Sequence, residues 1–293
     1  MSVTYPIPST LPPGYGAARV GGALVVARAD LLDAAARAVA QHGSLHAWAA
    51  ARPGSKPLAG RGVAWAAEAP AAAAQGLGRA AARWVVRHYR RGGAVARWLG
   101  DRYLRLGAAR PLRELRVSAA ARARGVRTPE VLALAVYPAA GFYRADLATA
   151  EVEDAVDLAE ALWAEHPDAA DPSARQACLG AAGALLRQLA DAGVRHPDLN
   201  AKNILLAPAA PGEAPPAAPR SPFAFACVLD LDGCTLAAPL SWRRRREAQA
   251  RLERSLRKWE RRTRRPLAPV EWAALRAALE ADHAPGIAQG RHA

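Results

Sequence analysis

The order of the expected elements predicts an α+β fold with a sheet-rich N-terminal half and a helix-rich C-terminal half. Runs of β-branched and aromatic residues fall mainly before residue 150, and most of the helical spacing of apolar residues follows it. The length of 293 residues fits one two-lobed protein or two small domains. We therefore predict an N-terminal lobe at residues 1–153 and a C-terminal lobe at residues 154–293.

Before residue 150 the sequence predicts two helices and several strands. Apolar residues at helical spacing predict a first helix over residues 30–42, which ends at Gly43. The second helix begins near Pro111 and ends before Gly125. Apart from the first helix, residues 1–55 are weakly patterned, and the alanine- and glycine-rich residues 69–78 are expected to form a hairpin loop. Strands are expected after Gly62, over 83–89, over 131–137 and over 142–149.

The C-terminal half is predicted to be mainly helical. A capping-box pattern at residues 173–176 opens a long helix that ends at Gly193. A short helix at 154–165 is predicted before this long helix, and a loop at 196–203 and a strand at 204–206 are predicted after it. A Pro/Ala-rich insertion at 207–222 separates that strand from the next one, at 223–229. A basic helix then runs to Pro266, and a last helix is expected at 270–281.

Cysteine usage and hydropathy indicate the compartment. Cys178, Cys227 and Cys234 form no CxxC pair, and an odd number does not suit a disulfide framework, so we expect buried thiols in a reducing compartment. We expect neither a secretory signal nor a transmembrane helix, because no segment has the required apolar run. The expected location is the cytosol or the cytosolic face of a membrane.

The strongest chemical motif has the form H-x-D-x-x-x-x-N and is followed by an apolar strand. In it, Asp198 is placed to accept a proton from an attacking hydroxyl, and Asn203 is placed to reach a metal that bridges phosphates. Asp230 follows the next apolar strand, where a carboxylate can hold Mg²⁺. Each residue alone would suit an ordinary cap or turn, but their combined spacing predicts a phosphoryl-transfer site.

The N-terminal half should supply a phosphate-binding loop and a cation. Gly60 and Gly62 are the candidates for the loop, although G-x-G alone is a weak signal. The candidate cation is Arg87 on the strand at 83–89, with Glu114 of the next helix as its partner, and a guanidinium can bind phosphate through two hydrogen bonds. Both residues are equally consistent with solvated surface charges.

Positive charge is concentrated near the C-terminus. The chain carries a net charge of +14, and residues 242–265 hold twelve Lys/Arg against three Glu. On a helix, Leu252, Leu256 and Trp259 share one face and arginines occupy the others. This pattern suits docking to anionic lipid head groups and lipid phosphates, but also a core helix with a solvated outer face. Nucleic-acid binding is less favoured, because no nucleic-acid-binding module accompanies the charge.

Together these residues resemble the lipopolysaccharide kinase family, and most closely its 3-deoxy-D-manno-octulosonic acid (Kdo) kinases. The combination of R-H-Y-R-R-G-G with D-L-N-x-x-N-I-L-L is more specific than either part. The matching stretches lie at residues 60–62, 65, 85–93, 100–104, 113–115, 143–147, 196–206, 230–232 and 254–258.

The resemblance implies a two-lobed protein-kinase-like fold that uses ATP and Mg²⁺. It implies Asp198 as the catalytic base, Asn203 and Asp230 as metal ligands, and Arg87 in place of the phosphate-binding lysine, paired with Glu114. The implied substrate is a Kdo–lipid A precursor, phosphorylated on the Kdo 4-hydroxyl by a peripheral protein at the cytoplasmic face of the inner membrane. For the adenine contact we expect the segment just after residue 149, at Glu151 and Val152.

Two other classes of function stay open. A kinase of another sugar, a metabolite or a protein would share the fold but not the acceptor. A non-catalytic pseudokinase that binds a membrane or a nucleic acid would be consistent with Arg in place of Lys at position 87. The oligomeric state is not indicated by the sequence.

Overall fold

The structure, a computed structural model, describes residues 4–58, 64–70, 82–90, 100–164, 171–208, 223 and 225–280. Gly60 and Gly62, most of the predicted hairpin loop at 69–78 and most of the insertion at 207–222 lie outside these residues. The chain forms two units, each compact by itself. The first contains residues 1–124, 128–153 and 230–236, and the second contains residues 125–127, 154–229 and 237–293.

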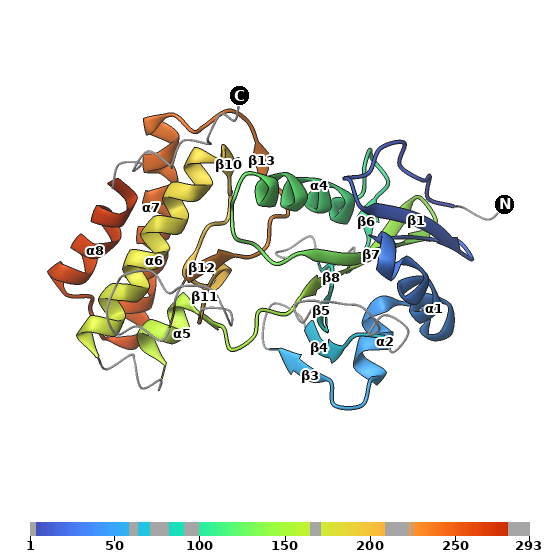
Figure 1. Cartoon of the computed structure of the whole chain (residues 1–293), viewed down its shortest axis with the longest axis horizontal. Coiled ribbons are helices and arrows are strands. Elements are labelled where there is room, and N and C mark those ends of the chain that lie inside the picture. Colours follow the sequence, from blue (N-terminus) through green and yellow to red (C-terminus); the bar gives the residue numbers. More distant parts are fainter. Residues whose placement is uncertain are drawn as a thin grey trace, which may run out of the picture. The chain divides into compact units, whose positions relative to one another are not determined.

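The first unit is built on one antiparallel sheet with the strand order β1-β2-β7-β8-β5-β4-β3, to which β6 adds by pairing with β8 (Figure 1). The central hairpin of β7 and β8 provides its longest strands. The strands are β1 (Tyr15–Val20), β2 (Ala23–Arg28), β3 (Lys56–Leu58), β4 (Ala64–Glu68), β5 (Arg83–His88), β6 (Tyr103–Leu104), β7 (Val131–Ala139) and β8 (Phe142–Ala150).

Helices cover both faces of this sheet. On one face, Val25 and Ala27 of β2 pack with the apolar residues of α1 (Leu32–His42) and α2 (Leu45–Ala51). On the other face, Leu24 and Val26 join a core that includes Leu112 and Leu115 of α4 (Arg110–Ala123). Because alternate residues of a strand point to opposite faces and both faces of β2 are covered, β2 is apolar from Ala23 to Ala27 rather than alternating.

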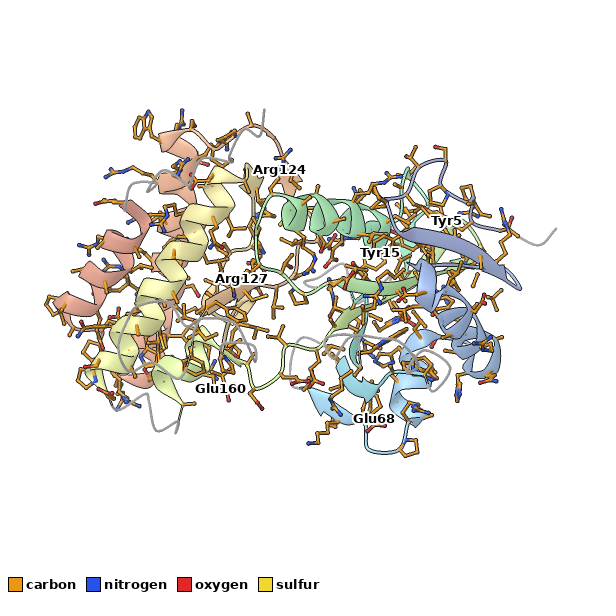
Figure 2. All side chains as sticks on the ribbon, in the orientation of Figure 1. Tyr5, Tyr15, Glu68, Arg124, Arg127 and Glu160 are labelled. Atoms are coloured by element: carbon orange, nitrogen blue, oxygen red, sulfur yellow. The ribbon has the colours of Figure 1, made fainter. Side chains whose placement is uncertain are left out.

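The N-terminal segment contains more structure than the sequence indicated. Strands β1 and β2 and helix α2 fall within residues that the sequence left unpatterned. The residues before β1 also belong to this unit, because the Tyr5 hydroxyl donates to the Gly107 carbonyl at 3.0 Å. The Tyr15 hydroxyl, at the start of β1, donates to the Val131 carbonyl at 2.6 Å (Figure 2).

The second unit consists mainly of helices. The long helix α6 runs beside α7 and α8 (Figure 1). Gly183 of α6 lies so close to α8 that an added Cβ would be 2.3 Å from the Leu275 carbonyl oxygen. The helices are α5 (Leu158–Trp163), α6 (Pro172–Asp191), the 3₁₀ helix η5 (Ala201–Asn203), α7 (Trp242–Thr263) and α8 (Pro269–Glu280), and the short strands β9 (Val156–Asp157), β11 (Ile204–Ala207) and β12 (Phe225–Val228) form a small sheet.

Two predicted helix starts are wrong. Helix α5 begins at Leu158 rather than at residue 154, because the Asp157 side chain caps it by accepting from the Glu160 amide. Helix α6 is capped by Asp171, which accepts from the Ser173 amide, so Ser173 lies inside the first turn instead of capping it. The starts of α5 and α6 both follow the preference of aspartate for the N-cap position.

Buried aromatic and ionic contacts hold the second unit together. The rings of Trp163 and Trp259 stack at 6.2 Å between centroids. Arg175 and Glu271, 9% and 4% exposed, form a bidentate ion pair between α6 and α8. Residues 125–127 belong to this unit because the Arg127 guanidinium (Figure 2) lies 4.2 Å from the centroid of the Phe225 ring. Among the described helices, none combines the length and hydrophobicity that spanning a membrane requires.

Candidate active site

The predicted catalytic loop has a defined hydrogen-bonded geometry within the second unit. The side-chain amide of Asn203 donates to the Asp198 carbonyl oxygen at 2.8 Å, and that of Asn200 donates to the same oxygen at 2.9 Å. Two amides therefore fix the backbone of Asp198, while its carboxylate is on an exposed residue. Because the Asn203 nitrogen donates within the loop, its Oδ1 atom is the one able to bind a cation.

The same loop holds the residue that precedes Asp230. The buried His196 donates from Nε2 to the Leu229 carbonyl at 3.0 Å, and the Leu229 amide donates to the Asn203 carbonyl at 2.8 Å. Both backbone polar groups of Leu229 are thus bonded to residues of the motif. Asp230 then adopts a left-handed conformation with φ of 58°, which Asp tolerates better than most residues. This turn ends the extended chain that β12 begins and leaves the Asp230 side chain exposed.

In the first unit, the predicted partners Arg87 and Glu114 form an ion pair. The Arg87 Nη2 atom lies 2.5 Å and 2.6 Å from the two carboxylate oxygens of Glu114, and 3.3 Å from Oδ1 of Asp230. Burial lowers the pKa of Arg87, but Glu114, Tyr89 and Asp230 raise it above its ordinary value, so the guanidinium stays charged. Arg87 therefore connects the carboxylate of helix α4 with the candidate metal ligand.

Tyr89 completes this cluster and was not predicted. Its ring lies 4.8 Å below the Arg87 guanidinium, and its buried hydroxyl donates to Oε2 of Glu114. Burial raises the pKa of Glu114, and the charge of Arg87 and the Tyr89 hydrogen bond oppose this effect only in part. Residues 87 and 89 are two apart on β5 and its extension, so they share one face; this spacing is the signal that could have identified Tyr89.

Helix α4 contacts the D-L-D segment at a second point. The guanidinium of Arg110 binds Asp232 through two nitrogens, with Nη2 to Oδ2 at 2.5 Å and Nε to Oδ1 at 3.2 Å. Arg110 and Glu114 are one helical turn apart and therefore lie on the same face of α4. Through them, one helix face orients Asp232 directly and Asp230 by way of Arg87. Sequence reasoning missed Arg110, although the i, i+4 spacing from Glu114 was visible.

A buried polar network lies on the opposite face of the sheet. His88 places Nδ1 2.6 Å from Oδ1 of the fully buried Asp146 and Nε2 3.0 Å from Oδ2 of Asp101. Asp146 also accepts from the Tyr137 hydroxyl and the His46 amide, both through Oδ2. Burial lowers the pKa of His88, but the two carboxylates raise it above its ordinary value. These two contacts anchor β5 next to Arg87.

The remaining predicted residues are placed as follows. Glu151 directly follows β8, and its amide donates to the Arg83 carbonyl at 3.0 Å while its carboxylate pairs with the Arg83 side chain. That amide is therefore engaged within the sheet, and adenine contact by Glu151 or by Val152 stays a prediction. Gly60 and Gly62 lie outside the described residues, so their predicted contact with phosphate also stays a prediction.

Each of the two predicted metal ligands has a side chain of a type that suits a small hard cation. Asn203 offers an amide oxygen and Asp230 a carboxylate, which are the ligand types that Mg²⁺ takes when phosphates complete its coordination. Among the described residues there is no group of three or more His, Cys, Asp or Glu that could hold a metal by itself.

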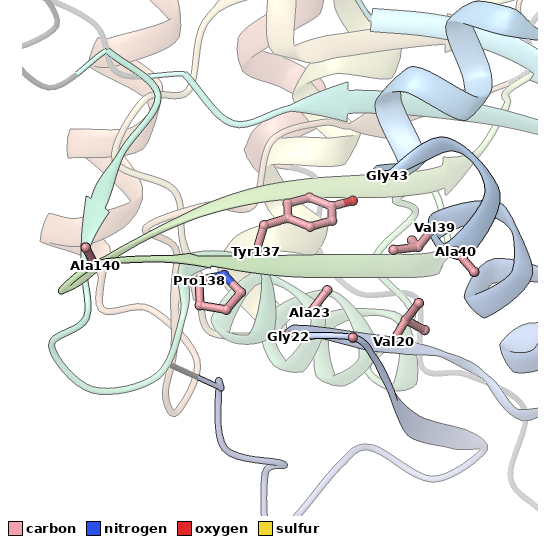
Figure 3. Close-up of a pocket in the computed structure, with 10 residues that line it drawn as sticks. Val20, Gly22, Ala23, Val39, Ala40, Gly43, Tyr137, Pro138 and Ala140 are labelled. Carbon is pink, nitrogen blue, oxygen red and sulfur yellow. The ribbon is translucent and has the colours of Figure 1, made fainter. Parts of the chain in front are cut away.

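A separate hollow in the first unit contains none of the predicted site residues. It has a volume of about 750 Å³ and is lined mainly by small and apolar residues of the β1–β2 turn, the end of α1 and the β7–β8 hairpin, among them Val20, Val39, Tyr137 and Pro138 (Figure 3). Its one phenolic hydroxyl, on Tyr137, is already bonded to the Leu45 amide and to Asp146. This hollow shows no catalytic group.

Comparison with known proteins identifies the family of this chain. The chain is 35% identical over 124 residues to 3-deoxy-D-manno-octulosonic acid kinase of Actinobacillus succinogenes; the alignment covers 41% of this chain and 49% of that protein, so the chain matches about half the length of this relative. A solved structure described as WaaP in complex with acyl carrier protein is 21% identical, covers 76% of this chain and 86% of its own, and gives a TM-score of 0.40. Residues 56–278 match the lipopolysaccharide kinase (Kdo/WaaP) family, to which this chain therefore belongs.

Proposed function

We propose that the chain is an ATP-dependent kinase that phosphorylates the 4-hydroxyl of a Kdo residue on a lipid A precursor. The observation that carries the proposal is the catalytic loop, in which Asn200 and Asn203 fix the backbone of an exposed Asp198. Family membership and the similarity to a Kdo kinase support a lipopolysaccharide acceptor. The 4-position rests on the resemblance alone.

Asp198 acts as the general base. As the acceptor oxygen forms a bond to the γ-phosphorus, the bond from that phosphorus to the β-phosphate oxygen breaks and ADP leaves. The hydroxyl proton passes to the Asp198 carboxylate, which must point into the acceptor site. The two hydrogen bonds to the Asp198 carbonyl restrict the backbone and so contribute to this orientation.

Arg87 neutralises phosphate charge, as the conserved lysine does in protein kinases. Glu114 and the ring of Tyr89 hold its guanidinium, so its position depends on helix α4. Asn203 and Asp230 would hold Mg²⁺, which when bound neutralises the charge of the β- and γ-phosphates. Since Arg87 also contacts Asp230, Mg²⁺ would compete with Arg87 for the Asp230 carboxylate, and the nucleotide phosphates would compete with that carboxylate for Arg87.

We place the protein at the cytoplasmic face of the inner membrane as a peripheral protein, because ATP is cytoplasmic and the proposed acceptor is a lipid. The concentration of positive charge in residues 242–265 supports this location.

The test is product analysis with the purified protein, Mg²⁺, ATP and a Kdo–lipid A precursor. We expect one added phosphate by mass spectrometry, and its position on the Kdo ring is read by phosphorus–proton correlated NMR. A phosphate at another hydroxyl would correct the position but keep the kinase. Absence of transfer to this acceptor, together with transfer to another sugar, a metabolite or a protein in an acceptor panel, would replace the substrate. Absence of Mg²⁺-dependent ATP binding by calorimetry would support the pseudokinase alternative.

A further inference from the structure

The outer face of α7 carries a straight row of cations. Its inner face is defined by Leu252 and Leu256, both fully buried in the second unit. At 100° per residue the opposite face is centred on positions 243, 254 and 261. The residues exposed on this side of the helix are Arg243, Arg244, Arg246, Arg254, Arg257, Lys258, Arg261 and Arg262, and they extend over about 29 Å of helix.

Few acidic groups compensate this row. Glu247 is the one carboxylate on the outer face of α7, where it contacts Arg243 at 3.7 Å and Arg244 at 3.1 Å. The other two carboxylates of the helix are engaged elsewhere, since Glu253 accepts from Gln249 and Glu260 accepts from the Leu267 amide. The outer face therefore presents a linear positive field, which suits an extended anionic surface better than a single phosphate.

An exposed tryptophan stands at the beginning of the same helix. Trp242 is 73% exposed, whereas Trp259 of the same helix is half-buried and stacks on the buried Trp163. An apolar ring with one N–H group, next to several arginines, is the side chain that partitions best into the head-group region of a bilayer. A nucleic acid would also attract the arginines and can stack on the exposed ring, but no nucleic-acid-binding module accompanies the charge.

We propose that α7 is a membrane-docking helix, whose outer row of cations binds anionic phospholipid head groups. The exposed Trp242, about 120° around the helix from the centre of this row, enters the interface from the helix end. The proposal rests on the proposed function only for its location at a membrane. Because the apolar face of α7 is turned into the protein, the helix binds at head-group level by charge and does not insert its length.

The inner side of α7 contacts the catalytic loop. The Ser255 hydroxyl of α7 accepts a hydrogen bond from the Ala201 amide at 3.1 Å, and the Lys202 ammonium lies 5.9 Å from the centroid of the Trp259 ring. Both contacted residues belong to the catalytic loop. Helix α7 thus supports the catalytic loop on its inner side and carries the lipid-facing charge on its outer side. The loop would therefore lie about 10 Å, one helix diameter, from the head groups.

The experiment is vesicle sedimentation of the full-length protein with vesicles that contain no Kdo lipid. One set is phosphatidylcholine alone, and the other also contains phosphatidylglycerol. The variant Arg243→Gln/Arg246→Gln/Arg254→Gln should bind the anionic vesicles about 100-fold more weakly than the wild type, from about 1 kcal/mol per cation near the surface. The matched control Arg19→Gln/Arg37→Gln/Lys56→Gln removes the same charge from exposed positions of the first unit and should bind like the wild type.

Two further measurements separate the contribution of Trp242 to vesicle binding from that of the arginines. Trp242→Ala should weaken binding several-fold and leave its salt dependence unchanged, whereas the triple arginine variant should lose most of the salt dependence. Circular dichroism and ATP binding should match the wild type for every variant, which excludes unfolding. The proposal would be overturned if both triple variants lost vesicle binding equally, or if the wild type bound vesicles equally well with and without phosphatidylglycerol. It would also be overturned if the triple arginine variant lost RNA binding but kept vesicle binding. Since no Kdo lipid is present, the result does not depend on whether the proposed phosphorylation is correct.

Discussion

Replacing Tyr89 by phenylalanine tests the cluster that holds Arg87. The change keeps the ring against the guanidinium and removes only the hydroxyl that donates to Glu114. Glu114 is 5% exposed, and a hydrogen bond to a buried charged group contributes about 1.5–3 kcal/mol. We expect Tyr89→Phe to lower the free energy of unfolding by this amount, because the buried carboxylate loses one of its partners.

The measurement is urea unfolding of the full-length chain, with Tyr5→Phe as the matched control. Tyr5 is equally buried in the same unit, but its hydroxyl donates to a neutral carbonyl, that of Gly107, so its loss should be about 1 kcal/mol. Tyr89→Leu should cost about 0.5–1 kcal/mol more than Tyr89→Phe, because the cation–π contact is lost as well. If Tyr89→Phe costs no more than Tyr5→Phe, the hydroxyl does not stabilise a buried carboxylate and the reasoning fails.

Three other perturbations follow from the same geometry. The pKa of His88 is raised in the folded state, so the stabilisation that its protonated ring contributes is complete below the unfolded pKa of about 6.5. That stabilisation is lost as pH rises through the higher folded pKa. The variant His88→Gln should therefore flatten this part of the curve of unfolding free energy against pH. Glu271→Ala should cost about 3–5 kcal/mol in chemical unfolding by leaving a buried guanidinium unpaired, and the double variant Arg175→Met/Glu271→Leu should recover most of it; a double variant as unstable as the single one would contradict this. Gly183→Ala should lower thermal stability by about 1–3 kcal/mol, because the new methyl group meets the Leu275 carbonyl, and an unchanged melting temperature would show that the two helices separate freely.

The sequence predicted the fold class and those elements that have distinct ends or periodicity. The α+β class, the hairpin of β7 and β8, and helices α1, α4, α6, α7 and α8 are present in the structure. Strands β1 and β2 were missed for a physical reason. The first is rich in Ala and Gly, and the second is buried on both faces, so neither shows the alternation that marks a half-buried strand.

For the candidate site, the sequence motifs identified residues that lie at characteristic spacings. They did not identify contacts that form only when separate elements pack together. The pair Arg87–Glu114 and the loop from His196 to Asn203 were predicted from motifs and their order. The spacings 87/89 and 110/114 indicate that Tyr89 and Arg110 share faces with Arg87 and Glu114, but they do not indicate which faces of β5 and α4 meet. The buried pairing of His88 with Asp146 depends likewise on the alignment of β5 with β8. The catalytic roles of the predicted residues stay predictions.

The central claim is that Asp198 is the base of a phosphoryl transfer to a Kdo lipid. Its most direct test is the rate of phosphate transfer from ATP to the Kdo–lipid A precursor by the wild type and by Asp198→Asn, with Asp33→Asn, at an exposed position of α1, as the control. We predict a fall of about 10²–10⁴-fold for Asp198→Asn, with ATP affinity unchanged and the control at the wild-type rate. An Asp198→Asn variant that transfers phosphate at the wild-type rate would contradict the assignment of the base.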